Sequence, residues 1–460
     1  MKKMTILTLV ILLGISLFVH FLYFGHPMET VFDEVHFGGF VSGYFTGKYF
    51  FDIHPPLGKL LISGMGYLGE VNPVQNFETI GREYLDSGYL WLRLLPTLAG
   101  VFLPLIIYLL ARRLRFSQLG ATLAGLFVIF ENSILTQSRF ILLDSFLLLF
   151  GFAGLLFYLI GRDRGKIGWF ILSALSLGLA ISVKWTGGSF LLLVGLIELF
   201  YLLKTRPHFG RWLRQIILFG AIPFIVYSGT FAIHFALLPN SGPGDAFMGP
   251  AFQKTLKGSL YERDQTIDPI NFWHKFTELN IQMFQANQNL TAEHPYSSTW
   301  ETWPFMGRTI FYWLGSPDVP DSQNLEKVRQ PRIYLVGNPI IYWASTLGII
   351  LLLGLSFLRS KIYFKNPRAT WIIISGFLIN FIPFLFIGRV MFLYHYMSAL
   401  IFTILALVYI LDCLEKNRKV VFASCIIVAI AFFSFFAPLS YGTPLSSEQF
   451  RQRIWLPSWE

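Results

Sequence analysis

Charged residues are scarce in this sequence, and their scarcity excludes an ordinary soluble protein. Asp, Glu, Lys and Arg make up 13% of the 460 residues, whereas roughly 25% is usual in soluble domains. Hydrophobic residues account for 54% and aromatic residues for 17%. This composition indicates a membrane protein.

Cysteine is almost absent, and the basic residues are not concentrated in one place. Only Cys413 and Cys425 are present, in or beside apolar segments, so a disulfide framework or a cysteine metal site is excluded and packing roles are expected. The net charge is +10, but nucleic-acid binding requires cations gathered on one face or arm. Here they form short groups between apolar runs, so we expect no nucleic-acid partner.

Eleven apolar runs are long enough to cross a bilayer, which takes about 20 residues. The predicted helices are at 4–24, 92–111, 118–137, 140–160, 168–184, 187–203, 216–238, 339–358, 370–387, 391–411 and 420–437. The first run resembles a signal peptide, but no small-residue cleavage site follows it, so we expect a retained span.

Lys and Arg mark alternate connections between these runs. The basic connections are at 112–115, 162–166, 204–214, 359–368 and 415–419. Because cytoplasmic loops are enriched in Lys and Arg, this pattern predicts a cytoplasmic N-terminus.

This orientation predicts four parts of the chain. They are helices one to seven in 1–238 with a first outer loop at 25–91, an outer loop at 239–338, helices eight to eleven in 339–437, and an outer tail at 438–460. The stretch LGKLLISGMGYLG in the first outer loop is too short to span a bilayer and is predicted to be an interfacial helix.

Four cations lie at the outer ends of predicted spans, where cations are expected to be rare. They are Arg93, Arg139, Lys184 and Arg389. A charged group at membrane depth costs at least ~2.5 kcal/mol unless it is paired or hydrated. Each one alone is explained equally well by snorkelling to headgroups, but the four together favour a shared anion-binding site.

Acidic residues gather at the same outer boundary. Asp33 and Glu34 follow the first span, and Glu131 and Asp144 lie near the outer ends of the third and fourth. Adjacent carboxylates repel each other unless a cation, a metal or a reacting proton uses them. The other two acids have structural interpretations. Asp144 would form an ion pair with Arg139, and Glu131 would be a buried, hydrogen-bonded acid.

Two histidines lie near the acidic pair. In the segment DIHPPLGK, two prolines hold the backbone extended and present His54 beside Asp52. Asp33, Glu34 and His36 together offer ligands for a metal ion, which remains an alternative use of this cluster.

The aromatic segment STWETWPFMGRTIFYW, at 298–313, has two interpretations. Tryptophans beside a span commonly form an interfacial belt. A stacking platform for a sugar or a peptide is the alternative.

Seven segments, in order, resemble the protein O-mannosyltransferase family. They are FDEVHF, YFFDIHPPLGKLL, SRFILLDS, SVKWTG, IHFALLPNSGPGDAFMGPAFQKTLKGS, VGNPIIYW and YHY. The resemblance implies an all-α polytopic membrane protein of about eleven transmembrane helices on the GT-C glycosyltransferase scaffold, with interfacial helices in the outer loops. Eukaryotic members carry a trefoil module between the seventh and eighth helices. Only 239–338 separates those helices here, so the chain resembles the compact prokaryotic form and the identity of the acceptor stays open.

The family resemblance also implies an activity and a set of residues. The activity is transfer of mannose, with inversion, from polyprenyl-phosphate-mannose to Ser or Thr hydroxyls of extracytoplasmic proteins. Asp33 and Glu34 are then the expected catalytic pair, with Asp33 as the base. For Glu34 two uses stay open, which are holding a sugar or acceptor hydroxyl and orienting a neighbouring residue. The matching positions near the donor are His54, Arg93, Arg139, Asp144, Lys184, Arg389 and His395.

The chemistry is consistent with these residue types. A carboxylate that takes the proton of an attacking hydroxyl contributes ~10² to 10⁴-fold. The leaving phosphate needs surrounding positive charge rather than an acid, and arginine can hold two of its oxygens at once. No cofactor or metal is required, because the lipid-linked sugar is itself a substrate.

The expected setting is the plasma membrane, with a multi-pass chain and an active site on the extracytoplasmic face. The expected partners are the bilayer, the polyprenyl-phosphate-linked sugar and a Ser/Thr-containing protein, and dimerisation is left open. One alternative is a glycosyltransferase of the same scaffold that modifies a lipid or cell-wall acceptor. A transporter is disfavoured, because its charges would lie near the bilayer midplane and its halves would often repeat.

Overall fold

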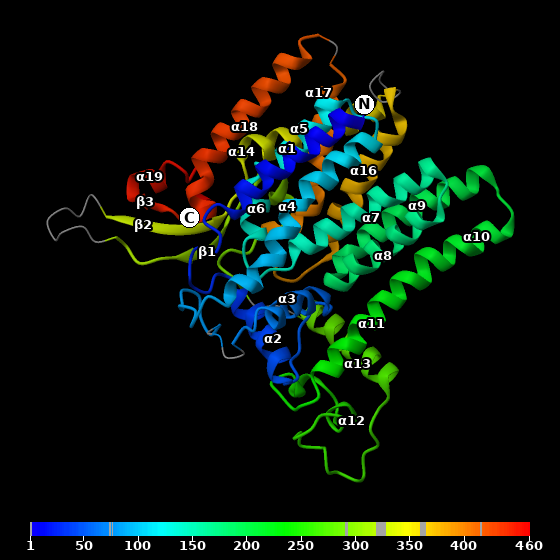
Figure 1. Cartoon of the computed structure of the whole chain (residues 1–460), viewed down its shortest axis with the longest axis vertical. Coiled ribbons are helices and arrows are strands. Elements are labelled where there is room, and N and C mark those ends of the chain that lie inside the picture. The colour runs from blue at the N-terminus through cyan, green and yellow to red at the C-terminus, as the bar shows by residue number, and fades with distance from the viewer. Residues whose placement is uncertain are drawn as a thin grey trace.

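The computed structural model describes residues 2–72, 75, 77–289, 293–318, 328–358, 365–414 and 416–460. Within these residues the chain is mostly helical (Figure 1). Nine helices there are long and apolar enough to span a membrane, or ten if one bent pair is counted as a span. The elements that carry the eleven predicted runs are α1 (Lys2–Phe21), α4 (Tyr89–Arg113), α5 (Gln118–Ile129), α6 (Asn132–Ser138), α7 (Asp144–Arg164), α8 (Ile167–Val183), α9 (Gly188–Thr205), α10 (Phe209–Ile216), α11 (Ile222–Leu237), α14 (Pro339–Phe357), α16 (Pro367–Phe381), α17 (Met397–Asp412) and α18 (Arg418–Tyr441).

The predicted helix at 118–137 is broken. The chain bends by 57° between α5 and α6. At the break Glu131 caps α6 by accepting hydrogen bonds from the backbone and hydroxyl of Ser133, at 3.2 and 2.9 Å. It also accepts from the backbone N–H of Asn338 at 3.1 Å. Glu131 is therefore a buried, hydrogen-bonded acid, and it ties the bend to the start of α14.

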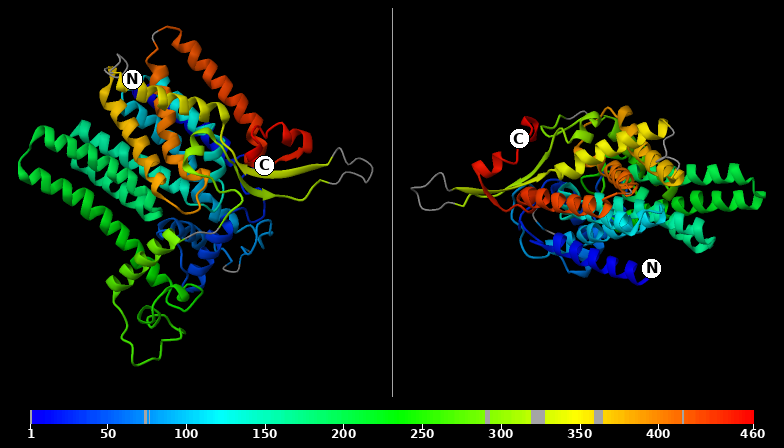
Figure 2. Two further views of the ribbon diagram at one scale, coloured as in Figure 1. Left: turned by 180° about the vertical axis from the view of Figure 1, so that it is seen from behind. Right: turned by 90° about the horizontal axis from the view of Figure 1, so that it is seen from above.

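Helices α7 and α17 form the centre of the bundle. In their most apolar windows 83% and 78% of residues are buried, compared with 22% in α1 and α18. Helices α4, α8 and α14 pack around this centre (Figures 1 and 2). Because α1 and α18 are peripheral, their exposed apolar side chains are suited to lipid. Asp144, at the start of α7, is consequently enclosed by protein.

The first outer loop folds against one end of this bundle (Figure 1). It contains α2 (Glu34–Thr46) and α3 (Leu57–Leu68), and α3 is the short helix predicted from LGKLLISGMGYLG. A second group of buried aromatic residues joins α2 to α11 and to the loop that carries α12 (Pro250–Gln253) and α13 (Phe272–Asn289). These contacts fix the loop that carries the acidic pair.

A small antiparallel sheet was not predicted from the sequence. It consists of β1 (Ile310–Leu314), β2 (Arg329–Leu335) and β3 (Pro444–Ser446), in the order β1-β2-β3. The strands project beside α18 and the short helix α19 (Ser447–Arg451) (Figure 2). A register shift between Phe311 and Trp313 makes Tyr312 the extra residue of a β-bulge. Bulges re-aim side chains and are common next to active sites.

Candidate active site

Asp33 lies at the start of α2, in the loop that follows the first span. The backbone carbonyl of Asp33 accepts the N–H groups of His36 and Phe37, at 3.0 and 2.9 Å, while its carboxylate does not cap the helix. Burial raises the pKa of Asp33 to about 6, with the charges of Asp144 and Asp52 adding to the rise and those of His36 and Lys184 opposing it. The pKa of the Asp33 carboxyl group is therefore close to neutral pH.

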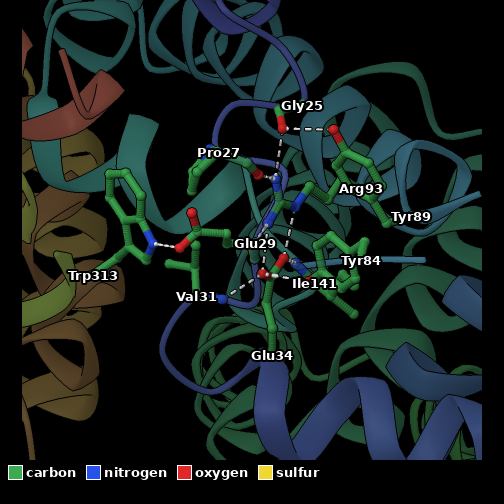
Figure 3. Close-up of polar contacts among 10 residues, drawn as sticks. All are labelled: Gly25, Pro27, Glu29, Val31, Glu34, Tyr84, Tyr89, Arg93, Ile141 and Trp313. Atoms are coloured by element: carbon green, nitrogen blue, oxygen red, sulfur yellow. Dashed lines mark hydrogen bonds and ion pairs between the residues drawn. The ribbon is translucent and has the colours of Figure 1, made fainter. Parts of the chain in front are cut away.

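Glu34 is part of a fully buried ion pair with Arg93 (Figure 3). Arg93 donates to the two carboxylate oxygens of Glu34 at 2.8 and 2.7 Å. Its remaining N–H groups donate to the carbonyl oxygens of Gly25, Pro27 and Glu29. A guanidinium has five N–H donors, and all five are used. Arg93 has none left for a donor phosphate, so its contacts do not support the predicted role in phosphate binding.

Three further groups hold the Glu34 carboxylate in place (Figure 3). The backbone N–H groups of Val31 and Ile141 donate to it at 2.8 and 2.9 Å, and the hydroxyl of Tyr84 donates at 2.9 Å. Glu34 is 0% exposed. These contacts favour the second use expected for Glu34, because they join the first outer loop to the α6–α7 connection and fix the backbone beside Asp33.

Arg139 also has a structural position. Its guanidinium donates to the carbonyl oxygens of His20, Leu22 and Tyr23 at 3.2, 2.6 and 2.7 Å. These carbonyls belong to the end of α1, where basic side chains commonly satisfy the last free carbonyl groups. The ring of Tyr441 covers the guanidinium at 4.7 Å. Arg139 does not line the large cavity and is used at the end of α1, so its predicted role near the donor has no support from its contacts.

The other five predicted donor positions line one cavity. Its volume is about 710 Å³, and it lies between α7, α9, α13, α16, the turn between α8 and α9, and the segment before α17. The polar residues shared with the sequence prediction are His54, Asp144, Lys184, Arg389 and His395. Asp33 is not one of the residues that line this cavity, but its carboxylate interacts electrostatically with Lys184 and Asp144, which do. The ring of the preceding residue, Phe32, lies 6.4 Å from the ring of Tyr394 in the cavity wall.

Lys184 and Asp144 form an ion pair in the cavity wall. The ammonium group contacts the two carboxylate oxygens at 2.8 and 2.9 Å. Lys184 lies in extended backbone directly after α8, and Asp144 is the first residue of α7. Asp144 thus pairs with Lys184 rather than with Arg139, which corrects the alternative drawn from the sequence.

His54 is held by the segment that follows it. The buried ammonium of Lys59 pairs with Asp52 and donates to the carbonyl oxygens of His54 and Pro55 at 2.9 and 3.2 Å. Burial lowers the pKa of His54 well below 6.5, and the nearby charge of Lys184 lowers it further. His54 is therefore a neutral imidazole in the cavity wall at neutral pH.

The aromatic segment 298–313 is mostly packing. Trp303, Tyr312 and Trp313 are buried, so they do not form the open stacking platform considered above. Trp303 stacks on His395 with a ring distance of 5.9 Å. This contact instead supports a residue of the cavity.

The metal alternative has no support in the described part of the chain. No group of three or more His, Cys, Asp or Glu residues is arranged there to hold a metal ion. His36 is exposed at the surface of α2.

Sequence reasoning missed Gln137, Tyr312 and Tyr394. The amide of Gln137 donates to Asp144 at 2.6 Å, and the Tyr312 hydroxyl donates to Gln137. The Lys184 ammonium lies 5.1 Å from the centre of the Tyr394 ring. Gln137 had a visible signal, since it is an amide within a predicted span, but aromatic residues are too common in this chain for the tyrosines to stand out.

Two family models match this chain in succession. The model for dolichyl-phosphate-mannose-protein mannosyltransferase matches residues 10–239. The model for the C-terminal four-helix membrane region of protein O-mannosyltransferase matches residues 272–459. The chain belongs to the protein O-mannosyltransferase family.

Curated members of the family are similar to part of the chain. Dolichyl-phosphate-mannose–protein mannosyltransferase 1 of Candida albicans is 36% identical over 271 residues, which cover 55% of this chain and 31% of the relative. Protein O-mannosyltransferase 1 of Drosophila melanogaster is 38% identical over 248 residues, covering 51% of this chain and 28% of the relative. These matches thus span about a third of the relatives' length.

Solved structures of the family and its neighbours share the fold. The S. cerevisiae Pmt1-Pmt2 complex bound to the sugar donor matches with a TM-score of 0.88 at 21% identity, covering 99% of this chain and 92% of the other. ArnT from Cupriavidus metallidurans, bound to undecaprenyl phosphate, matches with a TM-score of 0.55 at 14% identity, covering 94% and 76%. The predicted GT-C scaffold is confirmed.

Proposed function

We propose that this family member transfers mannose from polyprenyl-phosphate-mannose to Ser or Thr hydroxyls of extracytoplasmic proteins, with inversion at the anomeric carbon. The observation that carries the proposal is the position of Asp33. Its half-buried carboxylate lies within electrostatic reach of Lys184 and Asp144, which line the large cavity. A proton acceptor and a phosphate-binding cation thereby share one site.

Asp33 is the general base in this proposal. As the acceptor oxygen attacks the anomeric carbon, its proton passes to the Asp33 carboxylate. The bond between the anomeric carbon and the phosphate oxygen breaks, and the electron pair leaves with the polyprenyl phosphate. A pKa near neutral supports this role, because the carboxylate is then a stronger base than an ordinary aspartate while still ionised at neutral pH.

Lys184 and Arg389 are the proposed partners of the leaving phosphate. Both line the cavity, and positive charge stabilises the negative charge that develops on the leaving oxygen. The same cavity is lined by Leu192, Phe284 and Phe386, whose side chains are 52%, 53% and 79% exposed. A polar wall with an exposed apolar rim fits a phosphate attached to a lipid tail.

The proposed setting is the plasma membrane, with the N-terminus in the cytoplasm and the site on the opposite side. The alternation of Lys- and Arg-rich connections supports this orientation,. In Figure 1 the N-terminus of α1 and the loop that carries α2 lie at opposite ends of the bundle.

The proposed function predicts transfer of label from polyprenyl-phosphate-[¹⁴C]mannose to a Ser/Thr-rich peptide by the purified protein in detergent. A peptide in which alanine replaces every Ser and Thr is the matched control and is expected to stay unlabelled. Label that appears in a lipid acceptor, with none in the peptide, would contradict protein mannosylation and support the alternative acceptor class.

The pKa of Asp33 predicts how transfer depends on pH. Since the base acts only when ionised, kcat/KM for mannose transfer is expected to fall about tenfold per pH unit at pH values below about 6,. The measurement is a pH series at peptide concentrations well below KM, where the rate is proportional to kcat/KM, with protein integrity checked at each pH by size-exclusion chromatography. A rate that stays constant down to about pH 4.5 would remove a group with this pKa from the rate-limiting step.

A further inference from the structure

A chain of hydrogen bonds connects the outer sheet to the ion pair in the cavity. The hydroxyl of Tyr312 in β1 donates to the side-chain carbonyl of Gln137 in α6. The amide group of Gln137 donates to Asp144 in α7 at 2.6 Å, and Asp144 binds Lys184. All four side chains are buried, with exposed fractions of 0%, 3%, 5% and 7% along the chain.

The direction of each hydrogen bond in this chain is fixed by chemistry. An ionised carboxylate only accepts, so Gln137 must turn its NH₂ group toward Asp144. Its carbonyl oxygen then faces Tyr312, and the tyrosine must donate. If Gln137 turned around, its carbonyl oxygen would face the negative carboxylate of Asp144. Tyr312 therefore selects the one orientation of Gln137 that supports Asp144.

Tyr312 also contacts the segment that carries Asp33. Its ring stacks on Phe32 with a centroid distance of 4.2 Å and an interplanar angle of 9°. Its carbonyl oxygen accepts the backbone N–H of Phe32 at 3.1 Å. Tyr312 is the extra residue of the β-bulge, so the local strand geometry lets one residue make both sets of contacts.

We propose that Tyr312 is a positioning residue that sets the base and the phosphate-binding cation relative to each other. Through its ring and backbone it holds Phe32, and with it Asp33. Through its hydroxyl and Gln137 it holds Asp144, and with it Lys184. The inference rests on the proposed function, since it assigns Lys184 to the donor phosphate and Asp33 to the base.

The contacts of Tyr312 with Gln137 and its contacts with Phe32 predict different defects. Without the hydroxyl of Tyr312, the buried carbonyl of Gln137 loses its donor, and an unsatisfied buried acceptor is costly enough to favour another side-chain orientation. Asp144 then loses one of its partners, and Lys184 is no longer fixed for the phosphate. Phosphate binding should weaken, while Asp33 keeps its support. Loss of the Phe32 ring should do the opposite.

The test compares Tyr312→Phe with the parent protein in two measurements. One is direct binding of a polyprenyl monophosphate to the purified protein, and the other is mannose transfer at varied donor concentration. Tyr312→Phe is expected to weaken monophosphate binding and to raise the donor KM by about tenfold, with kcat changed by less than about threefold. Tyr334→Phe, a buried tyrosine of the neighbouring strand outside the chain of hydrogen bonds, is the matched control and should leave both constants unchanged.

Two further variants separate positioning from a general loss of packing. Gln137→Leu should reproduce the binding defect, and the double variant Tyr312→Phe/Gln137→Leu should be no worse than Gln137→Leu alone, because both changes cut the same connection. Phe32→Leu should lower kcat and leave monophosphate binding unchanged.

Binding that stays within about twofold of the parent in Tyr312→Phe would overturn the inference. Equal losses in kcat and in monophosphate binding in Tyr312→Phe, Gln137→Leu and Phe32→Leu would also overturn it. Such a result would indicate that the three side chains act only through packing. Because monophosphate binding is measured without turnover, the inference is tested even if the parent fails to mannosylate the peptide. That failure would count against the proposed function separately.

Discussion

Asp33→Asn is expected to lower mannose transfer to a Ser/Thr peptide by at least ~10²-fold, the lower end of what a general base contributes. Asparagine has nearly the same shape as aspartate but cannot accept the proton of the acceptor hydroxyl. Since the Asp33 carboxylate does not cap α2, the substitution should not unfold the loop. The measurement is kcat/KM for transfer, with binding of a polyprenyl monophosphate as the check that the cavity is intact.

Asp268→Asn is the matched control for this variant, because Asp268 is an exposed acid in the second outer loop. It should transfer mannose at the parent's rate. Retention of more than about a fifth of the parent's activity by Asp33→Asn would show that Asp33 is not the base. The family assignment would stand, and the acid that does the work would have to be sought elsewhere.

Arg93→Met is expected to destabilise the protein by about 3–5 kcal/mol, the usual cost of removing one partner of a buried ion pair. The cost is large because Glu34 would keep its charge in a site that is fully enclosed, with 0% exposure of both side chains. Three carbonyl groups of the first outer loop would also lose their donors. Thermal unfolding of the purified protein in detergent measures the effect.

Two variants give this experiment its controls. Arg93→Met/Glu34→Leu removes both charges, so it should be more stable than Arg93→Met alone. Arg451→Met changes an exposed arginine in α19 and should unfold at the parent's temperature. If Arg93→Met unfolded at the parent's temperature but bound polyprenyl monophosphate poorly, Arg93 would be a phosphate ligand after all.

The helices could be predicted because the bilayer sets both their length and their composition. Each predicted apolar run falls on helical structure, although 118–137 is divided between α5 and α6. The position of the break between α5 and α6 was not predicted from the sequence. At the bend Glu131 accepts a hydrogen bond from the backbone of Asn338, a residue far along the chain. Hydropathy alone treats 118–137 as one segment.

The partner of each cation could not be predicted from the sequence. Arg93 and Lys184 look alike there, since both are cations at the outer end of an apolar run. In the structure Arg93 is saturated by Glu34 and three carbonyl groups, whereas Lys184 lies in the wall of a large cavity. The difference comes from tertiary packing, which places Glu34 beside Arg93 and the large cavity beside Lys184.

The sheet was missed because its strands are short and lie in segments dominated by aromatic residues. Strand β1 has five residues and β3 has three, too few for an alternating pattern to stand out. Tyr312 was consequently grouped with an aromatic belt. Its position at a β-bulge, facing Gln137 of a distant helix, depends on the pairing with β2.

The most direct test of the account is an experimental structure of Asp33→Asn with polyprenyl-phosphate-mannose bound. We expect the phosphate to lie within hydrogen-bonding distance of Lys184 and Arg389, with the anomeric carbon facing the side chain at position 33. A phosphate bound at Arg93 or Arg139, or a sugar held away from position 33, would contradict the claim that a base and phosphate-binding cations meet at this cavity.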